Sequence, residues 1–178
     1  CCSFILPGTV YLSMDFQNFY KYESNIEDNT DHSFERGAIA LGYFHPVVQL
    51  QDFALSVGGE FSISPFLDES SNNGDGDLYS EANVYSIYLL PNFSVTDDFN
   101  IWTKIGYGAI DIEHFVSLDP GIIFGIGMHH MLSEHIGIGF GYTISTAHVD
   151  MDEYLGGGVP GEIELKLSRL AFNLGYSF

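Results

Sequence analysis

Basic residues are scarce in this sequence. Lys and Arg number 5 against 24 Asp and Glu, which gives a formal net charge of −19 at pH 7. Nucleic acids and anionic lipid surfaces attract basic patches, so this composition argues against a partner with a phosphate backbone. Acidity with few aromatic residues would indicate disorder, but 15% of the residues are Phe, Trp or Tyr and 46% are hydrophobic. The chain must therefore keep its charges apart from a large apolar surface.

Cysteine is almost absent, and long apolar runs are missing. Cys1 and Cys2 are the only cysteines and are adjacent, so no disulfide framework is indicated. No run of about 18 apolar residues occurs, so no transmembrane helix is predicted. The cysteine pair is compatible with the end of a trimmed leader within segment 1–8, with a lipidated N-terminal cysteine, or with an arbitrary start of the chain. Of these we favour the leader remnant.

The feature that the sequence has in abundance is alternation with a period of two residues. Large apolar residues occupy Leu170, Phe172, Leu174, Tyr176 and Phe178, and small or polar residues stand between them. This pattern is typical of a β-strand whose two faces meet different surroundings. It recurs in eight segments, which are residues 10–17, 36–43, 53–64, 84–89, 101–108, 121–129, 136–145 and 169–178.

The connections between these segments alternate in length. Most of the 24 acidic residues fall in the long connections. The short connections are 45–52, 96–99 and 133–135, and the long ones are 20–35, 67–81, 111–119 and 147–164. An even number of strands with alternating short and long connections is typical of outer-membrane barrels. The sequence therefore predicts one all-β domain over residues 1–178, an eight-stranded antiparallel up-and-down transmembrane β-barrel.

Charged residues on the non-apolar faces predict the contents of the lumen. These faces carry many small residues together with Asp15, Arg36, Glu60, Lys104 and Arg169. A soluble barrel would point its apolar face inward around a small ligand, whereas a membrane barrel points it toward lipid. Small residues and mixed charges suit a narrow eight-stranded interior. We therefore expect the apolar face outside, with Arg36–Glu60 and Asp15–Arg169 paired inside as a static plug rather than as a gate, because an unpaired buried charge is costly.

Two stretches carry a family resemblance. Leu170-Ala-Phe-Asn-Leu-Gly-Tyr-Ser-Phe178 and Ile101-Trp-Thr-Lys-Ile-Gly-Tyr-Gly108 resemble strands of the small bacterial outer-membrane barrels of the OmpA, OmpX and Opa type. Asn173 stands where the C-terminal strand of that group often has Gly. The resemblance implies a bacterial outer-membrane protein in contact with outer-membrane lipids, with its loops outside the cell and its termini in the periplasm. It also implies a signal read by the barrel-assembly machinery, formed by Phe172, Leu174, Tyr176 and Phe178.

One acidic segment invites a metal interpretation. Asn73, Asp75, Asp77 and Glu81 resemble part of a calcium loop, since hard cations prefer clustered carboxylate and amide oxygens. Leu78, however, occupies the position where such a loop has Gly, and the closing Glu comes early. We favour a solvated acidic segment that binds divalent cations at most weakly, and we expect no cofactor.

Histidines invite a catalytic interpretation. His129 and His130 are adjacent in a predicted strand, so they point to opposite faces and cannot easily hold one ion together. His114 and His148 lie in or near long connections, together with Asp111, Asp119 and Asp150. Some members of the resembled group are enzymes with a His and a Ser or Asp at the barrel rim. No spacing here fixes such a triad, so we do not expect an enzyme.

Three functions remain to be compared. The first is a structural or adhesin-like surface protein whose four long connections meet an unidentified extracellular partner. The second is an outer-membrane enzyme that acts on lipid or peptide at the rim, and the third is a soluble lipocalin-like carrier. In a membrane barrel the aromatic residues should form interfacial belts, with Tyr43, Phe53, Tyr176 and Phe178 on the periplasmic side.

Overall fold

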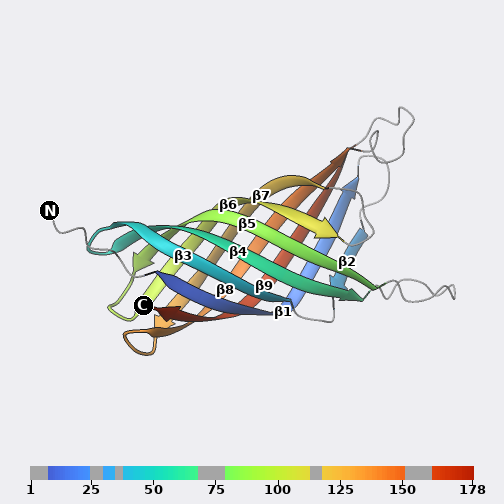
Figure 1. Cartoon of the computed structure of the whole chain (residues 1–178). Helices are drawn as coiled ribbons and strands as arrows, with labels where there is room; N and C mark the ends of the chain where they lie inside the picture. Colours follow the sequence, from blue (N-terminus) through green and yellow to red (C-terminus); the bar gives the residue numbers. More distant parts are fainter. Residues whose placement is uncertain (1–7, 25–29, 35–37, 68–78, 113–117, 151–161) are drawn as a thin grey trace.

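Strands make up the regular structure of the described chain. The computed structural model describes residues 8–24, 30–34, 38–67, 79–112, 118–150 and 162–178 (Figure 1). Among these residues, no helix is long and apolar enough to cross a membrane. The strands of the described part are β1 (Thr9–Ser24), β2 (Thr30–Phe34), β3 (Ile39–Gln49), β4 (Phe53–Leu67), β5 (Tyr79–Ser94), β6 (Phe99–Ile112), β7 (Asp119–Met131), β8 (Ile136–Asp150) and β9 (Glu162–Ser177).

These strands close into a barrel. Neighbours pair antiparallel in the order β2-β1-β3-β4-β5-β6-β7-β8-β9, and β9 pairs in turn with β1. Both β2 and β3 pair with β1, the first along Asn18–Tyr22 and the second along Thr9–Met14. They therefore share one position in the wall, and the barrel has eight strand positions. The predicted closed, eight-stranded antiparallel barrel is confirmed.

Three tight turns close one end of the barrel. Residues 50–52, 95–98 and 132–135 connect adjacent strands there, and β1 begins and β9 ends at this end (Figure 1). In each turn, the N–H of the first turn residue donates to the carbonyl of the first residue of the next strand, for example from Val95 to Phe99 at 2.9 Å. The second and third short connections fall where the sequence pattern predicts them, whereas the first is shorter than the predicted 45–52 because β3 continues to Gln49. We call this the short-turn end.

Toward the opposite end, the strands continue further than the apolar alternation predicts. Strand β1 reaches Ser24, β8 reaches Asp150 and β9 begins at Glu162, so parts of the segments predicted as long connections are strand. The reason is visible on β9, where Leu165 and Leu167 face inward and are buried while Lys166 between them is partly exposed. Here the outer face carries charge and the inner face is apolar. Backbone pairing persists although the apolar pattern has changed sides.

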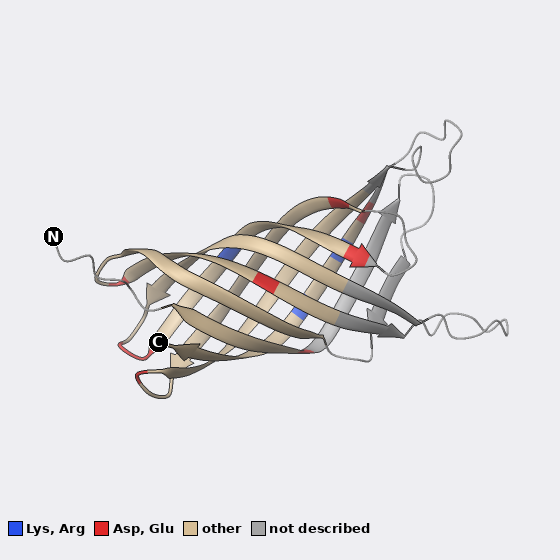
Figure 2. Cartoon of the chain, in the orientation of Figure 1, with Lys and Arg blue, Asp and Glu red and all other residues tan. Residues whose placement is uncertain are grey.

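The outward face of the remaining wall is apolar. Exposed large hydrophobic side chains occur on every strand from β3 to β9, and Ile87 at 71% and Ile122 at 62% are among the most exposed. Figure 2 shows few charged positions along this wall and acidic residues near the turns. Soluble monomers rarely expose contiguous apolar patches larger than a few hundred Å². The facing is that of a membrane barrel, and the soluble carrier is ruled out as an interpretation.

Glycines make room for aromatic side chains inside the barrel. Trp102 lies against Gly127 and Gly141, where a Cβ atom would collide with its ring, and Tyr11 lies in the same way against Gly42. The lumen is only wide enough for side chains. A flat ring therefore fits where the neighbouring strand has a glycine and so no side chain. The small residues of the inner face therefore accommodate large rings as well as long charged side chains.

Candidate functional site: the barrel lumen

A cluster of four charged side chains lies buried in the middle of the lumen. Asp15 is on β1, Glu60 on β4, Lys104 on β6 and Arg169 on β9, and the side chains are 0% to 8% exposed. Two acids and two bases balance in charge. Because a buried charge without a partner costs several kcal/mol, this balance is the condition under which the four groups can stay ionised inside the barrel.

Arg169 connects the two carboxylates. Its Nε donates to Oδ2 of Asp15 at 2.5 Å and its Nη2 donates to Oδ1 at 3.1 Å, a two-point contact that fits the planar guanidinium. Its Nη1 donates to Oε1 of Glu60 at 3.0 Å and to Oγ of Ser62 at 3.1 Å. One guanidinium thus ties β9 to β1 at the closing seam and to β4 across the lumen.

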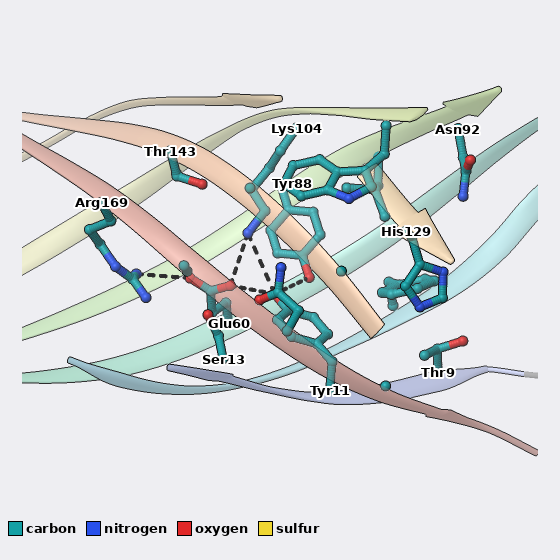
Figure 3. A pocket seen from close by; sticks show the side chains of 18 residues that line it. Thr9, Tyr11, Ser13, Glu60, Tyr88, Asn92, Lys104, His129, Thr143 and Arg169 are labelled. Atoms are coloured by element: carbon teal, nitrogen blue, oxygen red, sulfur yellow. Dashed lines mark hydrogen bonds and ion pairs between the residues drawn. The ribbon is translucent and has the colours of Figure 1, made fainter. Parts of the chain in front are cut away.

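Glu60 receives hydrogen bonds from three sides. Lys104 Nζ lies 2.9 Å from its Oε2, and the Tyr11 hydroxyl donates a short hydrogen bond to the same oxygen. The Tyr11 hydroxyl is also 2.9 Å from that of Tyr88, and Lys104 Nζ lies 4.5 Å from the centroid of the Tyr88 ring (Figure 3). The ammonium group is therefore held by a carboxylate and by an aromatic face, which attracts cations through its quadrupole.

The partners of Glu60 differ from those expected from strand adjacency. The pairing of Arg36 with Glu60 was predicted because the two residues fall on neighbouring segments, but Arg36 lies outside the described residues. In the described part Glu60 on β4 meets Lys104 on β6 and Arg169 on β9, neither of them an adjacent strand. Tyr11 and Tyr88 were missed as members of the cluster. Both tyrosines stand on the non-apolar face of their strands, and this position is the feature of the sequence that places them in the lumen.

Beyond this cluster, away from the short-turn end, most of the described inward side chains are apolar, although buried Ser62 and Ser145 lie among them. The apolar ones are well buried, with Ile123 and Leu167 each 2% exposed. We call them the apolar layer, and they are Ala38, Val84, Ile110, Leu118, Ile123, Ala147, Leu165 and Leu167. Ile123 stands between the outward Ile122 and Phe124 and so interrupts the alternation of β7, and its inward position in this layer accounts for an apolar residue there.

On the other side of the cluster, toward the short-turn end, lies a cavity of about 70 Å³. Figure 3 places Arg169 at one end of the row of lining residues and Thr9, Asn92 and His129 at the other. Between them the wall is largely aromatic, and Tyr11, Tyr88, Leu90 and Trp102 form one packed cluster against which Phe44 also lies. We call this space the entry cavity.

Only some of the residues considered for metal binding and catalysis belong to the described part of the chain. Asn73, Asp75, Asp77 and His114 lie outside the described residues, and the side chain of Glu81 is not described. His129 lines the entry cavity, while His130 faces outward. At the end opposite the short turns, His148 on β8 lies across from Asp119 on β7 and from Glu164 on β9.

Comparison with known proteins adds evidence on the fold. No protein-family model matches the chain, and no curated protein matches its sequence. Among solved structures, the outer-membrane protein OprG of Pseudomonas aeruginosa aligns with a TM-score of 0.52 at 12% identity over 97% of both chains. The attachment invasion locus protein Ail of Yersinia pestis aligns with a TM-score of 0.50 at 12% identity, over 96% of this chain and 99% of Ail. The chain has the fold of the small outer-membrane barrels.

The enzyme question is left open by these likenesses. The outer-membrane protease OmpT of Escherichia coli also aligns, with a TM-score of 0.50 at 9% identity over 97% of both chains. At such identities the likeness extends to the fold alone. Whether this outer-membrane barrel binds, conducts or hydrolyses must be argued from its own residues.

The C-terminal strand of the barrel presents its large residues outward. Phe172, Leu174, Tyr176 and Phe178 are 45% to 59% exposed. Near the short-turn end, Phe178 stacks on Tyr43 with ring centroids 6.4 Å apart, and Tyr176 stacks on His135 at 5.8 Å. Phe53 contacts Phe93 with centroids 5.0 Å apart. These residues are arranged as an interfacial belt requires, although their role in assembly stays a prediction.

Proposed function

We propose that this protein is a closed outer-membrane barrel that holds acidic surface segments outside the cell and does not conduct. One observation supports a lumen that is closed to ions, which is that the apolar layer lies next to the charge-balanced cluster along the barrel. An ion moving along the lumen would have to break buried pairs and then cross a stretch of hydrocarbon, where it would lose its hydration shell. Hydrophobic constrictions block pores in this way, by excluding water.

Reconstitution in a planar bilayer tests closure. The barrel should give no steady conductance in molar salt. The variant Leu165→Ser/Leu167→Ser makes part of the apolar layer polar and should conduct in brief events. A variant with Lys166→Ser, which changes the partly exposed residue between the two leucines, should behave as the unchanged protein does. Large, stable channels from the unchanged protein would refute the closed barrel.

The orientation that we infer places the short-turn end in the periplasm. The aromatic pairs Tyr43–Phe178 and His135–Tyr176 lie there, as expected for rings at a membrane interface. The acidic connections then face outward, and the net charge of −19 favours a basic partner or divalent cations over an anionic one. The heparin analogue sucrose octasulfate that Ail binds is an anion, so its chemistry does not suit this surface.

Surface display can be tested on intact cells. Proteinase added outside should cleave within residues 68–78 or 151–161 and leave the barrel wall intact. Cleavage confined to permeabilised cells would reverse the proposed orientation. Binding of a basic polypeptide such as polylysine to intact cells should weaken steeply as salt rises, because exposed charges are screened.

A rim hydrolase is the second candidate, and one observation favours it. The strand register places His148 directly across from Asp119 on β7 and from Glu164 on β9, at the end of the wall opposite the short turns. Acids of this kind can orient a histidine that acts as a general base. Turnover of peptide or lipid substrates that is lost in His148→Ala, with the barrel still folded, would establish this activity in place of a purely structural role.

A further inference from the structure

The entry cavity is a space that closure of the barrel does not require. It has a volume of about 70 Å³ and lies between the charged cluster and the short-turn end. The apolar layer and the charged cluster would close the lumen equally well if the short-turn half were filled. Its walls are instead built from aromatic rings that lie against glycines, which keeps the centre open.

Asn92 supplies a polar group that has no partner among the described residues. Its Oδ1 atom is buried and accepts no hydrogen bond from the described residues. Asn92 lies on β5 directly across from Trp102 on β6, and both line the entry cavity (Figure 3). A buried acceptor without a donor is unfavourable, so a bound molecule that donates to this oxygen would be stabilised.

The charges at the inner end of the cavity are already matched. Glu60 is paired with Lys104 and Arg169, and Arg169 is paired with Asp15. An ionic ligand would therefore bring an unbalanced charge into an enclosed site, which is costly. The aromatic walls favour a flat apolar body, since offset and edge-to-face contacts between rings are attractive.

We propose that the entry cavity binds a small, flat, uncharged aromatic molecule that carries one N–H or O–H donor. Because Oδ1 is closed off from the cavity, the Asn92 side chain turns to present this oxygen to the donor, and the ring lies along Trp102. An engineered cavity of about 150 Å³ encloses a whole benzene molecule. The smaller entry cavity therefore encloses part of such a ring, and the rest projects into the mouth near Thr9 and His129.

Trp102 makes the proposal directly testable, because the chain contains a single tryptophan. In ¹⁵N-labelled protein in detergent micelles, the indole N–H gives one NMR cross-peak. Titration with phenol should move this peak along a saturating curve in the millimolar range. Anisole has the same ring with a methoxy group in place of the donor, and it should bind at least tenfold more weakly to the unchanged protein.

Three variants separate the cavity from its surroundings. Asn92→Leu removes the acceptor and should weaken phenol binding about tenfold while anisole changes less than twofold. Gly175→Ala places a Cβ atom in ordinary contact with Thr9 Cγ2, at 3.4 Å, and narrows the mouth, so both probes should bind at least fivefold more weakly. Tyr107→Phe removes a hydroxyl on the outward face and should leave both titrations unchanged.

The outcomes decide between a binding site and a water-filled space. Saturable binding to the unchanged protein that is stronger for phenol than for anisole supports the proposal, even if a variant fails to fold. Linear shifts that are equal for phenol and anisole would reveal partition into the micelle alone, and no shift would reveal a cavity that holds only water. Equal saturating affinities for the two probes would show that Asn92 takes no part. Each of these three results overturns the proposal, and none depends on whether the barrel conducts.

Discussion

Glu60 is the residue on which the buried network converges. Replacing it by Gln removes the carboxylate that Lys104 contacts at 2.9 Å, whereas Arg169 keeps Asp15. Lys104 is then a buried charge without its carboxylate, and loss of one partner of such a pair costs about 3–5 kcal/mol. We expect Glu60→Gln to lower the free energy of unfolding by that amount, measured by urea unfolding in a fixed detergent.

The double variant Glu60→Gln/Lys104→Met should recover much of this loss, because no uncompensated charge remains. Asp97→Asn, in an exposed turn, serves as the control for removing a negative charge and should change the free energy of unfolding by under about 0.5 kcal/mol. If the double variant loses the sum of the two single effects, Glu60 and Lys104 are energetically independent and the network is wrongly described.

Gly127 illustrates how one missing side chain positions another. A Cβ atom there would collide both with the Trp102 ring and with the Phe140 carbonyl, and the backbone cannot yield as a side chain can. We expect Gly127→Ala to destabilise the barrel by about 1–3 kcal/mol, the usual cost of overpacking. Gly175→Ala, whose Cβ would make only ordinary contacts, should be close to neutral in the same urea assay. Equal losses would mean that Trp102 does not lie against Gly127.

The outer face of strand β9 changes from apolar to polar along its length, and this change can be tested within the one strand. Inward Leu167 is 2% exposed in the apolar layer, whereas Lys166 beside it is partly exposed. Leu167→Ala should cost about 2–5 kcal/mol, the range for truncation of a buried leucine. Lys166→Ala should cost under about 1 kcal/mol, since its contact with Glu164 is a surface ion pair. A larger loss at Lys166 would reverse the facing assigned to this half of the strand.

The same change of character explains what the sequence could and could not predict about the elements. Eight strands were predictable, because lipid requires a continuous apolar outer face and so imposes alternation along each strand. The far strand ends were not, since the outer residues of β9 turn polar beside Lys166 while backbone pairing continues unchanged. Backbone hydrogen bonds between strands continue there without an apolar outer face, so the alternation pattern ends before the strands do. The predicted connections were therefore too long.

The facing of the lumen residues was predictable, and so was the pair Asp15–Arg169 on adjacent strands, but the partners of Glu60 across the lumen were not. The four buried charged residues could be assigned to the inside because successive side chains of a strand point to opposite faces. They are Asp15, Glu60, Lys104 and Arg169. Partners were sought on adjacent strands, yet Lys104 on β6 reaches Glu60 on β4 past the strand between them. In a narrow barrel, long side chains meet across the lumen, and that distance depends on closure, which the sequence pattern does not give.

For the whole molecule, the proposed function separates stability from surface interaction along the barrel axis. The described wall is held by a ladder that β1 and β9 close, with pairing from Thr9–Ser177 to Ser24–Ile163. We expect the acidic connections to contribute little to this ladder. A scaffold of this kind lets surface segments change while folding is conserved, which suits a protein whose outer segments meet a variable partner.

The connection between β4 and β5 offers the sharpest test of this separation. Leu67 pairs with Tyr79, so the ladder itself holds the two ends of segment 68–78 together. Deleting residues 70–75 shortens a connection whose closure free energy changes by only about 0.6 kcal/mol for each doubling of length. The variant should unfold in urea within about 1 kcal/mol of the unchanged protein and keep its heat-modifiable migration on a gel. By contrast, deleting Asp97 and Asp98 removes the turn in which the N–H of Val95 and the carbonyl of Phe99 meet, and this variant should yield little folded barrel. If the first deletion impairs folding as severely as the second, the long connections help to build the barrel, and the division between scaffold and surface is wrong.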